Sequence, residues 1–173
     1  MEFYKYHSLG NDYLIYDCNK NQEALDKEKI VKLCNRNYGI GADGIVEGPY
    51  KKEGKMYVKV YNADGSEAEQ GGNAIRIFAH YLKTIKEVQS ESFSLYTKGG
   101  EVKLRFLNRE GTRIQMTMGQ LSFDSEKIGL TGPKREALHE YFNFGGEEYA
   151  CTCVSVGNPH CVIITCLLYT SPS

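Results

Sequence analysis

The chain has 173 residues, of which 41% are hydrophobic and 25% charged, a balance typical of a soluble globular protein with one ordinary domain or two very small ones. Its net charge of −1, with scattered Lys and Arg, excludes the basic surface of a nucleic-acid binder, and no apolar run is long enough for a membrane span. The six cysteines show no CxxC pair and no spacing typical of zinc ligands, so we expect no metal site. The N-terminal residues from Met1 lack the apolar core of a signal peptide, so we expect a cytoplasmic protein with reduced thiols.

The first part of the chain predicts two strands and a helix. Residues 2–6 and 13–17 are rich in aromatic and branched side chains, and residues 7–12 between them form a polar turn at a strand end. Helical spacing of apolar residues predicts an amphipathic helix over residues 24–36. The three glycines of residues 38–45 indicate a tight or left-handed loop, and their spacing does not fit the dinucleotide fingerprint GxGxxG.

A strand over residues 56–61 leads through a Gly-rich loop into a helix over residues 73–83. The polar positions of this helix recur at spacings of 3, 4 and 3 and draw one narrow stripe: Asn73, Arg76, His80 and Lys83. Because the rest of its surface is apolar, we expect a central element around which other structure wraps. Its start, preceded by Gly71-Gly72, offers free backbone N–H groups and suits a substrate carboxylate or another small anion.

The second part of the chain predicts mainly strands. These are a hairpin of residues 93–97 and 102–107 about a Lys-Gly-Gly turn, a further strand at 114–118, and strands at 149–156 and 162–164. Residues 133–142 have some helical pattern. The last nine residues, 165–173, carry no charge and no capping signal, and we interpret them as a non-native or truncated tail. Finding the same tail in the full-length reading frame would contradict that interpretation.

The predicted elements favour the α+β class. Several short strands accompany two helices, one of them apolar nearly all round. The natural arrangement is a strongly curved, mostly antiparallel sheet wrapped around the helix of residues 73–83.

Four polar segments complete the pattern. They are His7-Ser-Leu-Gly-Asn-Asp12, Gly39-Ile-Gly-Ala-Asp-Gly44, Asn62-Ala-Asp-Gly-Ser-Glu67 with Gly72-Asn73, and Gly157-Asn-Pro-His-Cys161. In this order and spacing the chain resembles the N-terminal half of the diaminopimelate epimerase family over residues 1–164. The resemblance implies two similar α+β domains with the active site between them, so residues 1–164 would form the N-terminal domain and the C-terminal domain would be absent.

The resemblance also implies a reaction, the interconversion of LL- and meso-diaminopimelate on the route to lysine and peptidoglycan. The family uses no cofactor, acts on a small molecule and can form a homodimer at full length. One cysteine thiolate removes the α-proton and a second thiol returns one from the opposite side. The developing carbanion needs fixed dipoles around its carboxylate, and a helix N-terminus helps to stabilise a thiolate.

Gly71 stands where the family has its first catalytic cysteine, and Ala74 stands where the family usually has glycine. The second catalytic cysteine belongs to the missing half. Because glycine has no group that can titrate, we expect no two-base epimerase activity from this chain as it stands.

The remaining site residues follow from the motifs. The resemblance assigns substrate binding to Asn11, Gly44, Asn62, Gly72, Asn73 and Asn158, and places His160 near the catalytic centre. Each has a structural alternative: Asn11 as a turn residue, Asn73 as a helix cap, His160 as a structural histidine. The sequence favours a buried strand cysteine over a nucleophile at Cys161.

Two other functions stay open. One is a phenazine-biosynthesis-type isomerase on the same fold, which works without the cysteine pair. The other is a non-catalytic amino-acid-binding pseudoenzyme that keeps the anion-holding loop without the acid–base groups. The segments Asn62–Glu67 and Gly157–His160 favour the epimerase branch.

Overall fold

The computed structural model describes residues 1–69 and 71–164, which divide into two compact units with the boundary between Thr117 and Met118. Each unit is described by itself. The tail predicted at residues 165–173 lies outside the described residues. No helix in the described part of the chain has the length and apolar character needed to cross a membrane. The assignment of residues 1–164 to one N-terminal domain stays a prediction.

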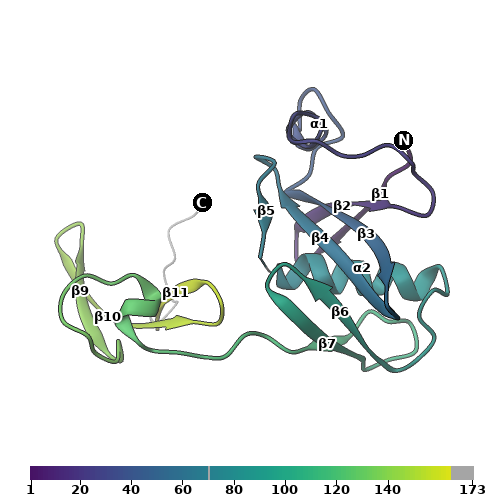
Figure 1. Ribbon diagram of the computed structural model, residues 1–173. Helices are drawn as coiled ribbons and strands as arrows, with labels where there is room; N and C mark the ends of the chain where they lie inside the picture. Colours follow the sequence, from purple (N-terminus) through teal and green to yellow (C-terminus); the bar gives the residue numbers. More distant parts are fainter. Residues whose placement is uncertain (70, 165–173) are drawn as a thin grey trace. The chain divides into compact units, whose positions relative to one another are not determined.

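The first unit is built on a sheet that curls around one helix (Figure 1). Its eight strands, counted over the described residues, are β1 Tyr4–Ser8, β2 Asn11–Asp17, β3 Gly44–Lys52, β4 Lys55–Asn62, β5 Glu67–Ala68, β6 Ser92–Thr97, β7 Gly100–Phe106 and β8 Ile114–Met116. The order is β1-β2-β3-β4-β6-β7-β8, with β5 paired to β4. The β2–β3 and β4–β6 pairs are parallel and the others antiparallel, which confirms the mostly antiparallel prediction.

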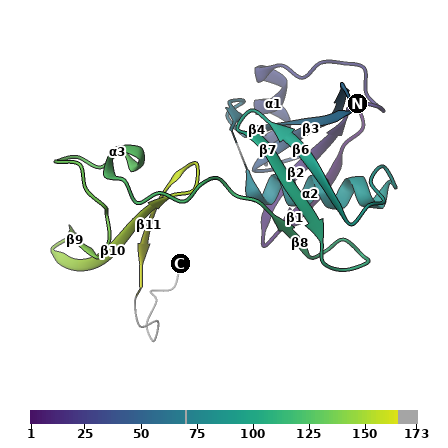
Figure 2. The same cartoon turned by 60° about the horizontal axis from the view of Figure 1, so that its bottom comes forward.

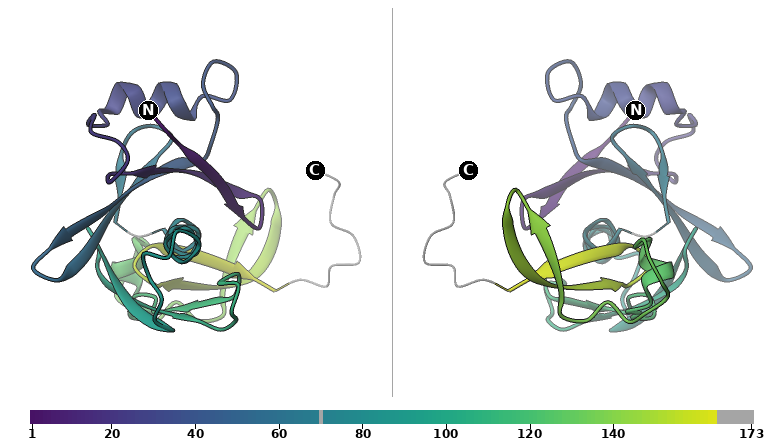
Figure 3. Two further views of the ribbon diagram at one scale, coloured as in Figure 1. Left: turned by 90° about the vertical axis from the view of Figure 1, so that its right-hand side faces the viewer. Right: turned by 90° about the vertical axis from the view of Figure 1, so that its left-hand side faces the viewer.

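Helix α2, Gly72–Thr84, occupies the inside of this sheet. Figure 3 looks down its axis and shows the strands of the first unit passing around it. Its apolar residues are all buried: Ala74, Ile75, Ile77, Phe78, Ala79, Tyr81 and Leu82. They pack against strand residues such as Ile15, Val60, Leu95 and Leu104 in one core. The wide apolar face therefore has partners on several sides, and the prediction of a central helix is confirmed.

Two local features of the first strands position the site. A two-residue turn with positive φ at Leu9 (54°) and Gly10 (86°) joins β1 to β2, as expected for a tight hairpin. Helix α1, Lys27–Cys34, is shorter than the predicted 24–36 and starts at an Asp26 cap that accepts from the Lys29 N–H at 2.8 Å. Its buried residues pack on the outer face of β2 and β3 in a second core cluster.

Strand β3 was not predicted from the sequence. The sequence predicted only a Gly-rich loop up to residue 45, yet residues 44–49 are all buried in the strand. A strand buried on both faces reads as a continuous apolar run instead of an alternation, and the register of β3 with β4 shifts between Glu47 and Tyr50. Both effects remove the periodic signal.

The second unit, starting at Met118, holds a smaller sheet (Figure 2). In its described residues the strands are β9 Glu140–Phe144, β10 Glu147–Ser155 and β11 Pro159–Ile163, ordered β11-β10-β9, and the helix is α3 Ser125–Ile128. The helical pattern predicted at 133–142 is wrong, because residues 140–144 form β9. Gly145 and Gly146, with φ of 64° and 96°, close a β9–β10 hairpin that overrides the local pattern.

Candidate functional site

Several predicted site residues gather at one end of the first unit. Asn11 opens β2, Gly44 opens β3 and Asn62 ends β4. The register places Gly44 directly opposite Asn62 and beside Tyr13, two residues after Asn11. Segments far apart in the sequence therefore meet at the same edge of the sheet.

The start of α2 joins this edge through a pair of asparagines. The Asn73 side-chain amide donates to Asn11 Oδ1 at 3.1 Å across 62 positions of sequence. Arg76, one turn along the helix, donates to Asn73 Oδ1. Because both ends of the Asn73 amide are engaged, its orientation is set, and the turn after β1 is tied to the helix N-terminus.

Two carboxylates and an arginine hold the other side of Asn11. The Asn11 amide donates to Asp43 Oδ2 at 2.8 Å, and Arg36 bridges Asp43 and Asp12 with contacts of 2.8 and 2.7 Å. The backbone N–H of each aspartate donates to the carboxylate of the other, at 3.0 and 3.1 Å. The Arg36 hydrogen bonds, aided by Lys5, hold the pKa of Asp12 well below its ordinary value despite burial. The result is a fixed ionised network under the turn.

The sequence did not predict Arg36 or Asp12 as part of this network. Both lie within or beside predicted elements, and their pairing joins residues 24 positions apart, which no local pattern reveals. The one available signal was the run of polar residues in the 7–12 turn next to an Asp-Gly pair at residues 43–44. These groups position Asn11 and, through its hydrogen bond, Asn73.

The N-terminus of α2 presents main-chain donors. Gly71 is the cap residue, and its carbonyl accepts from the Ile75 N–H at 2.9 Å. No side chain in the described part of the chain caps this end. The first N–H groups, from Gly72 onward, can therefore receive an anion, with the helix dipole in support.

Gly71 and Gly44 differ in what their surroundings would accept. Gly71 has φ −125° and ψ 102°, a conformation open to any residue, and an added Cβ would lie 3.3 Å from the Ala74 Cβ and 3.4 Å from a Val60 methyl. At Gly44 an added Cβ would lie 2.2 Å from the Tyr61 carbonyl oxygen and 2.7 Å from the Tyr13 ring. Packing requires glycine at position 44, whereas neither backbone nor packing requires it at position 71.

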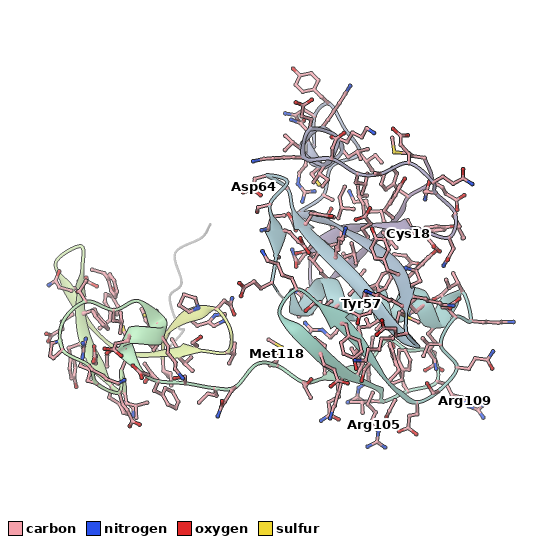
Figure 4. All side chains as sticks on the ribbon, in the orientation of Figure 1. Cys18, Tyr57, Asp64, Arg105, Arg109 and Met118 are labelled. Atoms are coloured by element: carbon pink, nitrogen blue, oxygen red, sulfur yellow. The ribbon has the colours of Figure 1, made fainter. Side chains whose placement is uncertain are left out.

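Asn62 belongs to a tight loop between β4 and β5, whose tip carries Asp64, labelled in Figure 4. The Asn62 amide donates to Ser66 Oγ at 3.0 Å, and Ser66 Oγ in turn donates to Asp64 Oδ1 at 2.6 Å. The Asn62 side chain is thus oriented by its own loop. The structure brings it to the same sheet edge as Asn11 through the Gly44 pairing.

Asn158 and His160 lie in the second unit, at the turn between β10 and β11. The His160 Nε2 is 3.1 Å from Asn158 Oδ1, and both side chains are exposed. Gly157, with φ 111°, makes the turn, and Pro159 starts β11. The motif therefore forms one local unit in which the asparagine fixes the imidazole.

The thiol next to the Asp12–Asp43 pair is Cys34, and it is buried on α1. Burial, together with the charges of Asp12 and Asp43, raises its pKa to about 11. Cys18, labelled in Figure 4, likewise has its pKa raised mainly by burial. Neither thiol is a suitable base at neutral pH, so neither replaces a side chain at Gly71.

Comparison with known proteins agrees with the resemblance found in the sequence motifs. Residues 3–123 match the family model described as diaminopimelate epimerase. The chain is 41% identical to "Diaminopimelate epimerase 2" of Nostoc sp. over 95% of this chain and 58% of the relative. It is 38% identical to "Diaminopimelate epimerase" of Pelotomaculum thermopropionicum over 94% of this chain and 60% of the relative. The chain thus spans about three fifths of the length of these relatives.

Solved structures show the same fold at low identity. A hydroxyproline epimerase from Agrobacterium vitis matches with a TM-score of 0.61 at 13% identity, over 93% of this chain and 50% of that one. A PhzF-family phenazine biosynthesis protein from Bacillus anthracis matches with a TM-score of 0.54 at 16% identity, over 93% and 53%. These likenesses extend to the fold alone.

Proposed function

The chain belongs to the diaminopimelate epimerase family, and from that premise we propose that residues 1–164 form the N-terminal part of a cofactor-independent amino-acid isomerase acting on diaminopimelate. The proposed reaction inverts one stereocentre, converting the LL form into the meso form. The substrate is a small molecule with two amino-acid ends, and the proposed site recognises one end by its carboxylate.

The observation that carries the proposal is the Asn11–Asn73 hydrogen bond at the start of α2. It holds two motif residues beside the main-chain N–H groups that follow Gly71. Removing the α-proton of an amino acid spreads negative charge into the adjacent carboxylate, and donors already fixed in place stabilise that charge most effectively. We assign the N–H groups of Gly72 and Asn73 to the carboxylate, and the Asn11 side chain to the same end of the substrate.

The other assignments complete the substrate site. Asn62 and Asn158 are proposed to bind polar groups of the substrate with their side-chain amides, supported by the hydrogen bonds that orient each one. Gly44 contributes through its main chain, because its surroundings exclude a side chain. His160 is proposed to lie near the catalytic centre, with Asn158 setting its ring orientation.

Gly71 favours a second function, binding without turnover. A two-base epimerisation needs a thiolate and a thiol on opposite faces of the α-carbon, and glycine supplies neither. The chain would then bind diaminopimelate through the α2 N-terminus and leave its stereochemistry unchanged. We propose this for the chain with Gly71 in place, in a cytoplasmic protein that uses neither nucleic acid nor membrane and that can form a homodimer at full length.

A titration of diaminopimelate against the purified chain tests binding. We expect heat of binding for the chain, and a loss of about tenfold or more in affinity for Asn11→Ala, which removes a side chain assigned to the substrate, since hydrogen bonds to charged groups contribute about 1.5–3 kcal/mol. Asn19→Ala, in the exposed turn after β2, is the matched control. The assignment would be refuted if the folded chain showed no binding of diaminopimelate, or if both variants lost the same amount of affinity.

Exchange of the substrate α-proton in D₂O tests catalysis. In a full-length form, Gly71→Cys should introduce exchange that the Gly71 protein lacks, and Gly71→Ser should not. Exchange by the Gly71 protein at the rate of the Gly71→Cys variant would show that another group is the base.

A further inference from the structure

Three thiols lie together in the second unit, and none of them is among the proposed substrate contacts. Cys151 and Cys153 alternate on one face of β10, and Cys161 lies on β11 directly opposite Cys153. All three are free cysteines. Burial and then the neighbouring Cys161 thiol raise the pKa of Cys153 to about 11, and the same two causes raise the pKa of Cys151. Cys161 is therefore a close neighbour of both.

The register decides which pair is closer. The Cys153 N–H donates to the Ala137 carbonyl at 2.9 Å, on the side of the strand away from β11. In an antiparallel ladder this makes Cys153 and Cys161 a non-hydrogen-bonded pair, the kind whose Cα atoms lie about 4.5 Å apart. A disulfide needs a Cα–Cα distance of about 4.4–6.8 Å, so this pair can be bridged without moving the strands. Cys151 lies opposite Ile163 and reaches Cys161 only along the diagonal, which is longer.

The two thiols also differ in access. Cys161 is exposed on β11, the edge strand of this sheet in the described residues, so the prediction of a buried cysteine at this position is wrong; Cys153 is buried. An oxidant from solution therefore meets Cys161 first and finds the second thiol already in place behind it. Cysteines that oxidise reversibly are often exposed and placed next to a second thiol that can resolve them, which is the arrangement of Cys161 and Cys153.

We propose that Cys153 and Cys161 form an oxidative modification site, a cross-strand disulfide made by exchange with a low-molecular-weight disulfide. In the first step the Cys161 thiolate attacks one sulfur of the small disulfide, giving a mixed disulfide and releasing one small thiolate, which takes up a proton. In the second step Cys153 loses its proton and attacks the Cys161 sulfur, releasing the second small thiol. Two protein thiols are oxidised and one small disulfide is reduced to two thiols.

The bond would act on the turn that carries His160. Cys161 follows His160 directly, and residues 155–159 close the turn between the two strands. A disulfide at Cys161 fixes β11 to β10 one residue from the imidazole. If the proposed function is correct, oxidation restricts the Asn158–His160 segment; the disulfide itself does not depend on that function.

The experiment treats the native chain with 2-hydroxyethyl disulfide and counts free thiols by alkylation and mass spectrometry. A Cys166→Ser background removes the sixth cysteine. We expect two thiols lost as an internal disulfide in this background and in the added Cys151→Ser variant. With Cys153→Ser, closure should slow by about tenfold or more and Cys161 should accumulate as the mixed disulfide.

Three results would overturn the proposal. One is closure that survives Cys153→Ser and is lost in Cys151→Ser, which would assign the bond to the diagonal pair. Another is an unchanged thiol count in a chain that circular dichroism shows to be folded. The third is the same mixture of disulfides in the native chain and in guanidinium, since the strand register would then have no part in the pairing.

Discussion

Two glycine-to-alanine changes at the candidate site should have opposite effects on stability. At Gly44 the new Cβ would lie 2.2 Å from the Tyr61 carbonyl oxygen, a main-chain atom of the paired strand. Relief requires β3 and β4 to separate locally, and overpacking of this kind costs about 1–3 kcal/mol or more. At Gly71 the backbone is extended, and the added methyl restricts the unfolded chain, which stabilises by about 0.4–1 kcal/mol.

The contacts at Gly71 reduce that gain. The new Cβ would lie 3.3 Å from the Ala74 Cβ and 3.4 Å from a Val60 methyl, and because the Ala74 Cβ moves only with its backbone, the start of α2 must give slightly to relieve the crowding. We therefore expect Gly71→Ala between neutral and about 1 kcal/mol stabilising. The two variants should differ by roughly 2–3 kcal/mol in the free energy of unfolding.

Urea unfolding followed by circular dichroism measures the difference. With an m-value of about 1–3 kcal/mol/M, Gly44→Ala should lower the midpoint by roughly 1 M, while Gly71→Ala leaves it unchanged or slightly higher. Gly54→Ala, at the β3–β4 turn with φ 73° and nothing within 4 Å, is the control for backbone strain without crowding. Equal shifts at positions 44 and 71, or a neutral Gly44→Ala, would refute the packing explanation.

Three further changes test the core and the polar network. Tyr81→Phe removes the 2.6 Å hydrogen bond to the buried Asp17 carboxylate and should lower the free energy of unfolding by about 1.5–3 kcal/mol in urea. Asp12→Asn should destabilise at neutral pH; because the pKa of Asp12 is depressed in the folded state, the stability that its charge contributes is present above the unfolded pKa of about 3.9 and is lost as the pH falls below it. Arg36→Ala should weaken diaminopimelate binding in a titration, because Asp43 loses the contact that holds it under Asn11.

Each of these changes has an outcome that would contradict it, and two of them have a control variant. Tyr38→Phe alters an exposed hydroxyl and should be neutral; equality with Tyr81→Phe would exclude the buried hydrogen bond as the cause. A difference between the wild-type chain and Asp12→Asn that grows on acidification would reverse the sign expected for a depressed pKa. Arg105→Ala, at an exposed position of β7, should leave binding unchanged, and a loss equal to that of Arg36→Ala would point to overall charge.

Periodicity predicted the centre of the fold better than its edges. The stripe formed by Asn73, Arg76 and His80 located α2 within a residue at each end, because a helix surrounded by sheet has a strong pattern. Strand β3 was missed since burial on both faces removes alternation, and the helical pattern at 133–142 lost to the hairpin turn at Gly145. The local sequence does not determine which strands a given strand pairs with or which of its faces are buried.

The candidate site also has a part that was predicted from the sequence and a part that was not. Its motif residues were predicted from resemblance, and the gathering of Asn11, Gly44, Asn62 and Asn73 at one end of the first unit follows from strand register. The network that orders them was not predicted, because Arg36 reaches Asp12 across the fold. Ion pairs between residues far apart in the sequence can be identified only from the tertiary structure.

The room around Gly71 has a genetic consequence. The backbone is extended, and a Cβ at this position would meet an alanine methyl at 3.3 Å and a valine methyl at 3.4 Å, so a small side chain can enter or leave with only a slight adjustment of its neighbours. Some glycine codons differ from cysteine codons by a single nucleotide. One point mutation can therefore switch a thiol on or off at the start of α2 while the rest of the first unit keeps its fold.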